Sequence, residues 1–264
     1  MDYQRYSILY PMNIIDTHCH LDFKIFDADR EAVIRRARRD GVSGFVIPGV
    51  EWRTWDVLLE ICQSSSDLHC ALGLHPMFLQ QHENWHVNEL ESYISEHKPV
   101  AVGEIGLDFY DRKHTDRQIE LFEMQLGVAQ DVQLPVILHV RKAHEEVLAC
   151  LKKFRIKAGI VHAFNGSVQQ AERYLQYNFK FGFGGMLTYQ RSTKLRKLAS
   201  ELSLESIVLE TDSPDMAVEQ HRGERNSPEY LPYCLKALAE IRNISLERVA
   251  ELTTSNAQEV LELD

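Results

Sequence analysis

Eight short apolar segments alternate with longer amphipathic stretches along the chain. Several of them are continuously apolar, as at residues 136–138 and 207–209, which is typical of strands buried on both faces of a parallel sheet. We therefore predict eight parallel strands. Their expected bounds are 14–17, 44–47, 69–74, 100–105, 136–140, 159–162, 180–183 and 207–211.

The stretches between these segments carry helix signals. The patterns Thr115-x-x-Gln118 and Ser167-x-x-Gln170 each predict a capping box, in which a hydroxyl and an amide side chain satisfy free backbone N–H groups of the first helical turn. After Thr115, apolar residues recur at helical spacing and predict a stripe that faces the core. The stripe consists of Ile119, Phe122, Leu126 and Ala129.

Eight strands that alternate with helices predict an α/β fold of the (β/α)8 TIM barrel class. A length of 264 residues fits one such domain over residues 1–264, with residues 1–11 interpreted as a poorly ordered extension. The alternative is an open doubly wound sheet, which predicts a glycine-rich nucleotide-binding loop after the first strand. Residues 16–22 read Asp-Thr-His-Cys-His-Leu-Asp at that place, so the barrel is favoured.

The bulk composition is that of a globular protein with an acidic surface. Apolar residues make up 44% of the chain and charged residues 26%, and 29 basic against 39 acidic residues give a formal charge of −10. Such a charge disfavours broad, salt-dependent binding to a long polyanion. The charge does not exclude binding of a nucleic acid whose phosphates are neutralised by metal ions at the site.

Cysteine usage and hydropathy predict the compartment. The five cysteines include no Cys-x-x-Cys pair, which indicates free thiols in a reducing environment. No signal peptide is recognisable, and no apolar run reaches the roughly 18 residues that a membrane span needs. We expect a cytoplasmic protein without a membrane partner, and the sequence leaves the oligomeric state open.

Candidate metal ligands stand at the ends of the expected strands. His18 and His20 lie two residues apart, and residues i and i+2 of an extended strand face the same side. A lone His-x-His pair is a weak signal, because a single histidine is as often a core or surface residue as a ligand. The position of the whole set carries the prediction, since the C-terminal ends of barrel strands meet at one mouth. The set is His18, His20, Glu104, His139, His162 and Asp212.

These residue types predict a centre for two divalent metal ions. Imidazole and carboxylate ligands without thiolates suit Zn²⁺, Mn²⁺ or Mg²⁺. Glu104 can bridge two ions through its two oxygens, and two ions about 3.5–4 Å apart stabilise the attacking and leaving oxygens of an in-line displacement. Asp212 is expected to bind one ion and to orient or deprotonate the attacking water. Glu104 and Asp212 are therefore the predicted catalytic residues of a hydrolase.

Six short motifs occur in order along the chain, and the match that they carry extends over essentially the whole chain after residue 12. They are 16–22 (DTHCHLD), 103–108 (GEIGLD), 139–141 (HVR), 162–166 (HAFNG), 209–214 (LETDSP) and 225–228 (RNSP). This set resembles the TatD family of metal-dependent deoxyribonucleases. The resemblance implies a TIM barrel, two divalent metals and phosphodiester hydrolysis, as a DNase or 3′→5′ exonuclease acting on DNA ends. It also implies one ion held by His18, His20, Glu104 and Asp212, and another held by Glu104, His139 and His162.

Four further residues are expected around the metals. His75 follows the third expected strand and Arg141 the fifth, and both are predicted to contact the substrate; an ordinary solvated loop explains Arg141 nearly as well. Asp108 and Asp215 follow ligand positions by a few residues. We expect them to orient a ligand histidine or a water from behind.

Two other classes of function stay open. A small-molecule esterase, lactonase or phosphoesterase of the amidohydrolase type would use the same two-metal barrel, although related barrels often bridge the metals with a modified lysine where Glu104 stands here. A non-catalytic binding protein is disfavoured because all six ligand-type residues are present. The chain departs from the TatD pattern at Val140 and at residues 75–78 (HPMF), and we expect both departures to affect the substrate pocket. The expected partner is DNA with single-stranded or frayed ends, or a small phosphoester.

Overall fold

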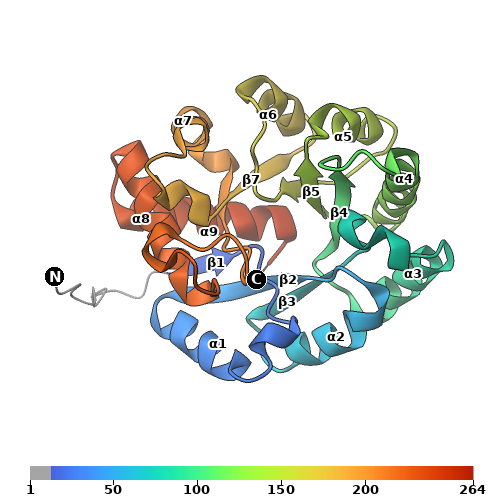
Figure 1. Ribbon diagram of the computed structural model, residues 1–264, viewed down its shortest axis with the longest axis horizontal. Helices are drawn as coiled ribbons and strands as arrows, with labels where there is room; N and C mark the ends of the chain where they lie inside the picture. The colour runs from blue at the N-terminus through green and yellow to red at the C-terminus, as the bar shows by residue number, and fades with distance from the viewer. Residues whose placement is uncertain (1–12, 264) are drawn as a thin grey trace.

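Eight strands and nine α-helices alternate in the part of the chain that the computed structural model describes, residues 13–263 (Figure 1). The strands are β1 (Ile14–Asp16), β2 (Val42–Pro48), β3 (Leu68–Leu72), β4 (Ala101–Asp108), β5 (Val136–Arg141), β6 (Gly159–Val161), β7 (Phe179–Phe183) and β8 (Ile207–Leu209). The α-helices are α1 (Arg30–Arg39), α2 (Trp55–Gln63), α3 (Trp85–His97), α4 (Thr115–Val132), α5 (His144–Leu151), α6 (Val168–Leu175), α7 (Thr193–Glu201), α8 (Leu231–Arg242) and α9 (Leu246–Leu261).

Short 3-10 helices fill several of the connections between these elements. They are η1 (Lys24–Phe26), η2 (Trp52–Thr54), η3 (Pro76–Gln81), η4 (Gly185–Thr188), η5 (Leu204–Ser206), η6 (Glu219–His221) and η7 (Pro228–Tyr230). The expected extension at residues 1–11 lies outside the described residues. None of the helices within residues 13–263 is long and apolar enough to cross a membrane.

The strands form one parallel sheet that curls into a barrel. Its order is β1 to β8, and all seven adjacent pairs are parallel. The two ends of the sheet meet where the amide of Thr17 donates to the carbonyl of Leu209 (3.0 Å) and the amide of Asp212 donates to the carbonyl of His18 (2.8 Å). The predicted (β/α)8 TIM barrel is confirmed, and the open doubly wound alternative is wrong.

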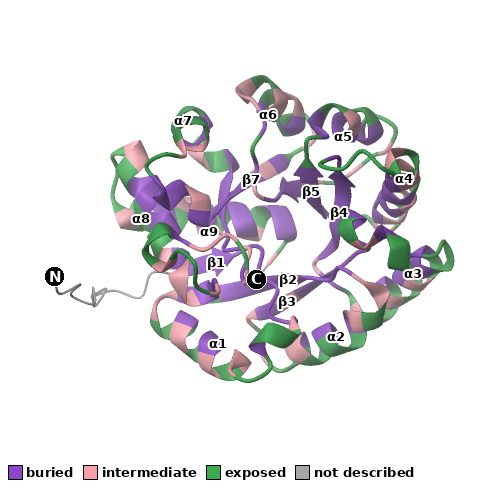
Figure 2. Cartoon of the chain, viewed as in Figure 1, coloured by how far each residue is buried: buried purple, intermediate pink, exposed green. Residues whose placement is uncertain are grey.

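The strand alternation builds two apolar regions, one on each side of the barrel wall. Residues on the outer face pack against the surrounding helices, as Val136 and Leu138 of β5 do, whereas Ile137 faces the barrel interior. The strands are buried, and the helices are exposed on the faces that point away from the barrel (Figure 2). Helix α9 packs its apolar face on the interior residues at one end of the barrel and seals it.

Two local predictions had different outcomes. The capping box at Ser167 is confirmed, because its hydroxyl accepts from the amide of Gln170 (3.1 Å) while the Gln170 side chain accepts from the amide of Ser167 (3.0 Å). The box at Thr115 is wrong. The Gln118 side chain instead bonds both the amide (2.8 Å) and the carbonyl (3.0 Å) of Asp108. A tertiary contact with the end of β4 has replaced the local cap.

Candidate metal centre

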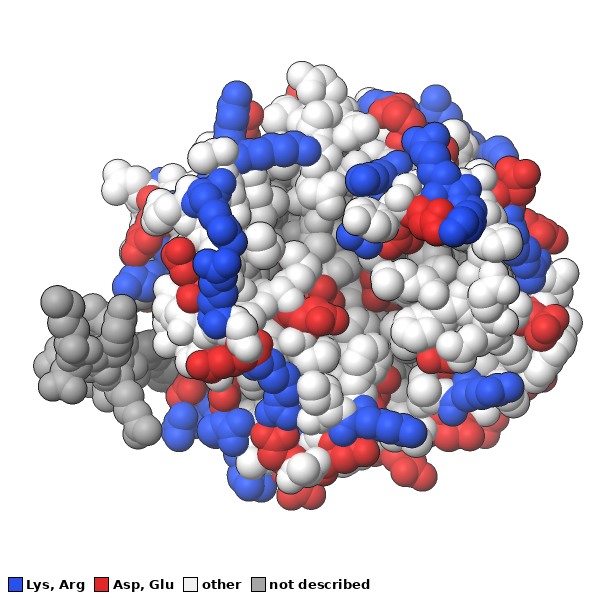
Figure 3. Space-filling model, in the orientation of Figure 1, with Lys and Arg blue, Asp and Glu red and all other residues white. Residues whose placement is uncertain are grey.

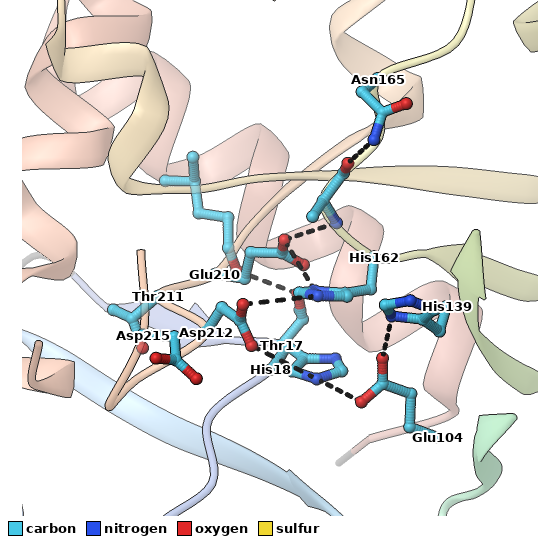
Figure 4. Close-up of polar contacts among 12 residues, drawn as sticks. Thr17, His18, Glu104, His139, His162, Asn165, Glu210, Thr211, Asp212 and Asp215 are labelled. Carbon is cyan, nitrogen blue, oxygen red and sulfur yellow. Dashed lines mark hydrogen bonds and ion pairs between the residues drawn. The ribbon is translucent and has the colours of Figure 1, made fainter. Parts of the chain in front are cut away.

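The six predicted ligands lie close together at the C-terminal end of the barrel, and Figure 4 shows five of them, His18, Glu104, His139, His162 and Asp212. Strand parity explains why: His139 follows the interior residue Ile137 by two positions, and His162 follows Ile160 in the same way. Glu104 comes from β4, where the register with β5 shifts between Val102 and Ile105. The structure therefore gathers side chains from β4 and β5 and from the segments that directly follow β1, β6 and β8.

The first group lies around His18, His20 and one oxygen of Glu104. Nε2 of His18 is 3.3 Å from Nε2 of His20 and 3.1 Å from Oε2 of Glu104, and Nε2 of His20 is 3.7 Å from that oxygen. Oδ1 of Asp212 lies 3.9 Å and 3.7 Å from the two imidazole nitrogens. Ligands at 2.0–2.1 Å from a tetrahedral ion would stand about 3.3–3.4 Å apart. The spacing of these four atoms fits a single cation.

The two histidines of this group are in the protonation state that a metal ligand needs. Burial lowers the pKa of His20 to about 4, and burial together with the neighbouring His162 holds the pKa of His18 well below its usual value. Both rings are therefore neutral at pH 7 and offer a lone pair. Their Nδ1 atoms have no hydrogen-bond partner among the described residues, so only the Nε2 side is engaged.

The second group forms around the other oxygen of Glu104. Oε1 of Glu104 is 3.1 Å from Nδ1 of His139 and 3.2 Å from Nε2 of His75. Burial alone would raise the pKa of Glu104, but His75, His18 and His139 hold it well below its usual range. The carboxylate is therefore ionised, with one oxygen turned to each group.

The third group joins His162 to Asp212. Nε2 of His162 is 3.7 Å from Oδ2 of Asp212, and the ring stacks on His18 at 3.7 Å between centroids. Burial would lower the pKa of His162, yet the carboxylates of Glu210 and Asp212 raise it to about 10. Burial raises the pKa of Asp212 to about 7, assisted by Glu104 and Glu210 and opposed by His162. Glu210 and Asp212 thus favour a positive charge at His162, and a metal ion bound at its Nε2 would take the place of the proton.

Glu210 is a site residue that the sequence reasoning missed. It is almost fully buried, its Oε1 lies 3.0 Å from Nδ1 of His162, and the same oxygen accepts from the amide of Ala163 (2.7 Å). A side chain on Gly182 would stand 2.0 Å from Oε2 of Glu210, so the β7 glycine makes room for it. Carboxylates behind a ligand histidine fix its tautomer and orientation. Its position directly after β8 and two residues before Asp212 was the available signal.

Hydrogen bonds between the ends of β1 and β8 hold the backbone next to the first group of ligands. Asp16 is fully buried and accepts from the amide (2.9 Å) and hydroxyl (2.6 Å) of Thr211. Burial raises the pKa of Asp16 to about 8, against the effect of these hydrogen bonds. Asp212 adopts a left-handed backbone conformation with φ of 56°, which is rarely populated and often found at functional sites. The hydrogen bonds between β1 and β8 thus fix the backbone that carries His18 and Asp212.

The remaining predicted residues lie around these ligands. Asp108 is buried, and its Oδ2 is 3.1 Å from Nε2 of His139, as expected for an orienting carboxylate. Arg141 lies at the rim, with Nη1 3.6 Å from the same oxygen. The side chain of Asp215 is exposed and has no hydrogen bond or ion pair with the candidate ligands among residues 13–263, whereas its amide donates to the carbonyl of Asp212 (2.9 Å). The prediction that Asp215 orients a ligand histidine or a water therefore stays a prediction, although the charge of Asp215 contributes to the raised pKa of Asp212.

The departure from the family pattern at Val140 does not reach the substrate pocket. Val140 is buried in the outer apolar region between the barrel and the helices, because it alternates with the inward His139. The expectation that it affects the pocket is wrong. At the other departure, Phe78 lies edge-on to His75 at 6.0 Å and Met77 is 64% exposed, so this segment does border the mouth.

The residues present fit divalent cations. The described residues form three clusters of three potential ligands, and within each cluster the ligand atoms all lie within 4.8 Å of one another. The clusters share His18 and Glu104. Nitrogen and carboxylate donors without thiolate suit Zn²⁺, Mn²⁺ or Mg²⁺. Buried carboxylates this close together are costly unless a positive charge balances them. The chain can therefore hold metal ions at this mouth.

Comparison with known proteins gives one consistent family. Residues 15–262 match the family model described as TatD related DNase. The uncharacterized metal-dependent hydrolase YjjV of Escherichia coli K12 is 39% identical over 246 residues, covering 92% of this chain and 95% of that protein. The uncharacterized metal-dependent hydrolase YabD of Bacillus subtilis is 33% identical over 258 residues, covering 95% of this chain and 100% of that protein.

Structural comparison agrees with the sequence matches. The crystal structure of YjjV, a TatD homolog from Escherichia coli K12, superposes with a TM-score of 0.92 at 37% identity, covering 97% of this chain and 100% of that chain. The similarity thus extends over the whole described barrel and includes the strands that carry the clustered histidines and carboxylates. The chain belongs to the family of TatD-related DNases, and it is a metal-dependent hydrolase.

Proposed function

We propose that the protein hydrolyses phosphodiester bonds at DNA ends, as a DNase or 3′→5′ exonuclease, with two divalent ions at the barrel mouth. One observation carries this proposal. The two oxygens of Glu104 face two different ligand groups, His18 and His20 on one side and His139 on the other. A carboxylate in this position can bridge two cations. The match to a family of DNases supports the choice of substrate.

The six ligand-type residues divide between two positions in this proposal. His18, His20, Glu104 and Asp212 would hold one ion, and Glu104, His139 and His162 the other. When bound, the ions supply Lewis-acid chemistry, which lowers the pKa of water and neutralises charge on phosphoryl oxygens. Zn²⁺, Mn²⁺ and Mg²⁺ all remain compatible with these donors.

The chain's own groups orient the reactants and move the proton. Asp212, whose two oxygens face His18, His20 and His162, is the carboxylate that would accept the proton of the attacking water. Asp108 and Glu210 hold the rings of His139 and His162 from behind. His75 and Arg141 stand where the substrate phosphate would enter, and Arg141 supplies a guanidinium that matches phosphate geometry.

The test is hydrolysis of a single-stranded DNA oligonucleotide labelled at either the 3′ or the 5′ end. We expect stepwise shortening with at least one of Mg²⁺, Mn²⁺ and Zn²⁺, and the label gives the polarity. Glu104→Ala and Asp212→Ala should each lower the rate by about 10³-fold, since each removes charge stabilisation from the reacting centre. Glu31→Ala is the matched control, because Glu31 is 92% exposed on α1.

Two further measurements separate failure of the substrate from failure of the site. Chelator should abolish cleavage, and metal analysis of the wild-type protein should give two ions, with fewer in Glu104→Ala. If two ions bind but no oligonucleotide is cut, the DNase proposal fails. Turnover of a lactone or an aryl ester in that case would favour the small-molecule hydrolase instead.

A further inference from the structure

Two cationic side chains converge on one exposed aromatic ring at the rim of the mouth. The guanidinium carbon of Arg141 lies 4.0 Å from the ring centroid of Tyr110, and Nζ of Lys142 lies 4.6 Å from it. Tyr110 is 63% exposed and lies two residues after the end of β4. The negative face of an aromatic ring attracts cations. The Tyr110 ring therefore keeps the positive charges of Arg141 and Lys142 close to each other and exposed to solvent.

Asp108 ties this rim cluster to the candidate metal centre. Its Oδ1 accepts from the amide of Tyr110 (2.9 Å), while Oδ2 lies 3.6 Å from Nη1 of Arg141 and 3.1 Å from Nε2 of His139. One carboxylate therefore fixes the ring, the guanidinium and a candidate metal ligand. A single negative charge shared with His139 does not balance both Arg141 and Lys142, and their remaining N–H donors stay available to an anion.

The position of the cluster relative to the centre is set by β5. His139 and Arg141 are residues i and i+2 of one strand, so they share a face and stand about 6.6 Å apart along it. Lys and Arg side chains gather along the rim near α4 to α7, around acidic groups in the hollow (Figure 3). An anion bound by Arg141 would therefore lie nearer the rim of the mouth than a phosphate bound at His139, by about the spacing of these two residues along β5.

We infer that Arg141, Lys142 and the Tyr110 ring form a subsite for a second phosphate group of the substrate, the one next to the linkage that is cut. The inference rests on the proposed phosphodiesterase function and extends it. Lys142 and Arg141 pair with the flanking phosphate, and Tyr110 keeps both cations at the rim in its absence. Substrates with a charged neighbouring linkage are then preferred over those with a single phosphate.

The first test measures binding without catalysis. In EDTA, titration calorimetry compares the thymidine trinucleotide dTpTpT with its two isomers that carry one neutral methylphosphonate linkage. For at least one isomer we expect the wild-type Kd to rise about tenfold, and we expect Lys142→Gln to bind all three equally. The salt dependence of binding should also fall by roughly 0.7 in log–log slope in that variant, the value for one single-strand phosphate contact. Inorganic phosphate, added as a competitor, shows whether the subsite also takes the free ion.

Lys98→Gln is the matched control. Lys98 is exposed, has a left-handed backbone conformation like Lys142 (φ of 50° and 55°), and caps α3 at the end of the barrel remote from the mouth. It should keep the tenfold discrimination. Equal binding of all three trinucleotides by the wild type, or loss of discrimination in Lys98→Gln as well, would overturn the inference.

The second test keeps failure of the subsite distinct from failure of the proposed function. With metal present, bis(p-nitrophenyl) phosphate reports cleavage of a diester that has no flanking phosphate. We expect Lys142→Gln to raise the KM of dTpTpT about tenfold relative to the KM of this small diester. If the wild type cleaves both substrates and this ratio stays unchanged, the subsite is wrong and the phosphodiesterase stands. If neither is cleaved, the phosphodiesterase is wrong, and discrimination in EDTA then decides whether the rim still binds a second phosphate.

Discussion

The two ends of the barrel interior differ in chemistry although the same strands form both. At the sealed end, the inward residues are apolar and pack against α9. At the mouth, they are titratable and buried or half-buried. On β5 and β6 the change occurs within two residues, from Ile137 to His139 and from Ile160 to His162. The apolar end consists of Ile15, Val46, Ala71, Ala101, Ile137, Ile160, Val208, Ala257, Val260 and Leu261.

This difference separates stability from chemistry along single strands. Apolar burial at the sealed end lowers the free energy of the folded state, whereas buried carboxylates and imidazoles at the mouth cost desolvation that only mutual contacts or a cation offset. The mouth can therefore be altered with large effects on function and small effects on folding. The sealed end should show the reverse.

The largest expected effect comes from a cavity at the sealed end. Ile160→Ala removes three carbons from a fully buried site and should lower the free energy of unfolding by about 2–5 kcal/mol, because the surrounding barrel cannot close the cavity. Chemical denaturation measures this change. At 25 °C the folded enzyme should keep its kcat, since no atom of the candidate metal centre is altered.

Ile160→Val is the graded control and should cost only about 0.5–1.5 kcal/mol. A large fall in kcat in either folded variant, with bound metal unchanged, would break the separation between the two ends. The interior would then act as one unit, in which the apolar end positions His162 through the strand.

The second-largest expected effect comes from a substitution at the mouth of the barrel. Glu210→Gln keeps the size of the buried side chain but removes the charge 3.0 Å from Nδ1 of His162. We expect about a 10–100-fold loss of metal affinity or activity, the usual cost of losing a carboxylate behind a ligand histidine. Metal titration followed by activity at saturating metal separates weaker binding from slower turnover.

Glu145→Gln provides the control, since Glu145 is exposed on α5 and pairs with Arg173 of α6 (2.6 Å) outside the barrel wall. It should leave metal affinity unchanged. If Glu210→Gln binds metal as the wild type does and lowers only the melting temperature, Glu210 is a structural residue and the orienting role is wrong.

The sequence predicted most of the fold because its signals are local. Continuous apolar runs such as residues 136–138 define strands directly, and all eight expected strands overlap the observed ones. The convergence of His18, Glu104 and Asp212 was also predictable, since strand ends in a barrel meet at one mouth. Their assignment as metal ligands stays a prediction.

Contacts between residues that are distant in the sequence explain what the sequence did not reveal. Gln118 fits a capping pattern, but its side chain bonds the backbone of Asp108 at the end of β4. Tyr110 becomes a candidate binding residue only because Arg141 and Lys142 lie over its ring in the folded chain. Glu210 was inside a recognised motif without an assigned role, because its partner His162 lies 48 positions away. Such pairings depend on the register of neighbouring strands, which no local pattern encodes.

The smallest expected effect concerns the outer rim of the mouth, where charges are solvated. Arg225, in the loop after β8, bonds both oxygens of Asp29 ahead of α1 (2.9 and 2.7 Å), and these hydrogen bonds lower the pKa of Asp29 below its usual value. Because both side chains are partly exposed, Asp29→Asn should cost only about 0.5 kcal/mol at pH 7. A lowered folded-state pKa means that this contribution is present above about pH 4 and is lost as the pH falls through the folded-state value. Denaturation of Asp29→Asn, Arg225→Gln and the double variant should give a coupling near 0.5 kcal/mol at pH 7 and none at pH 2.5; a coupling of several kcal/mol would place this rim pair with the buried groups of the mouth.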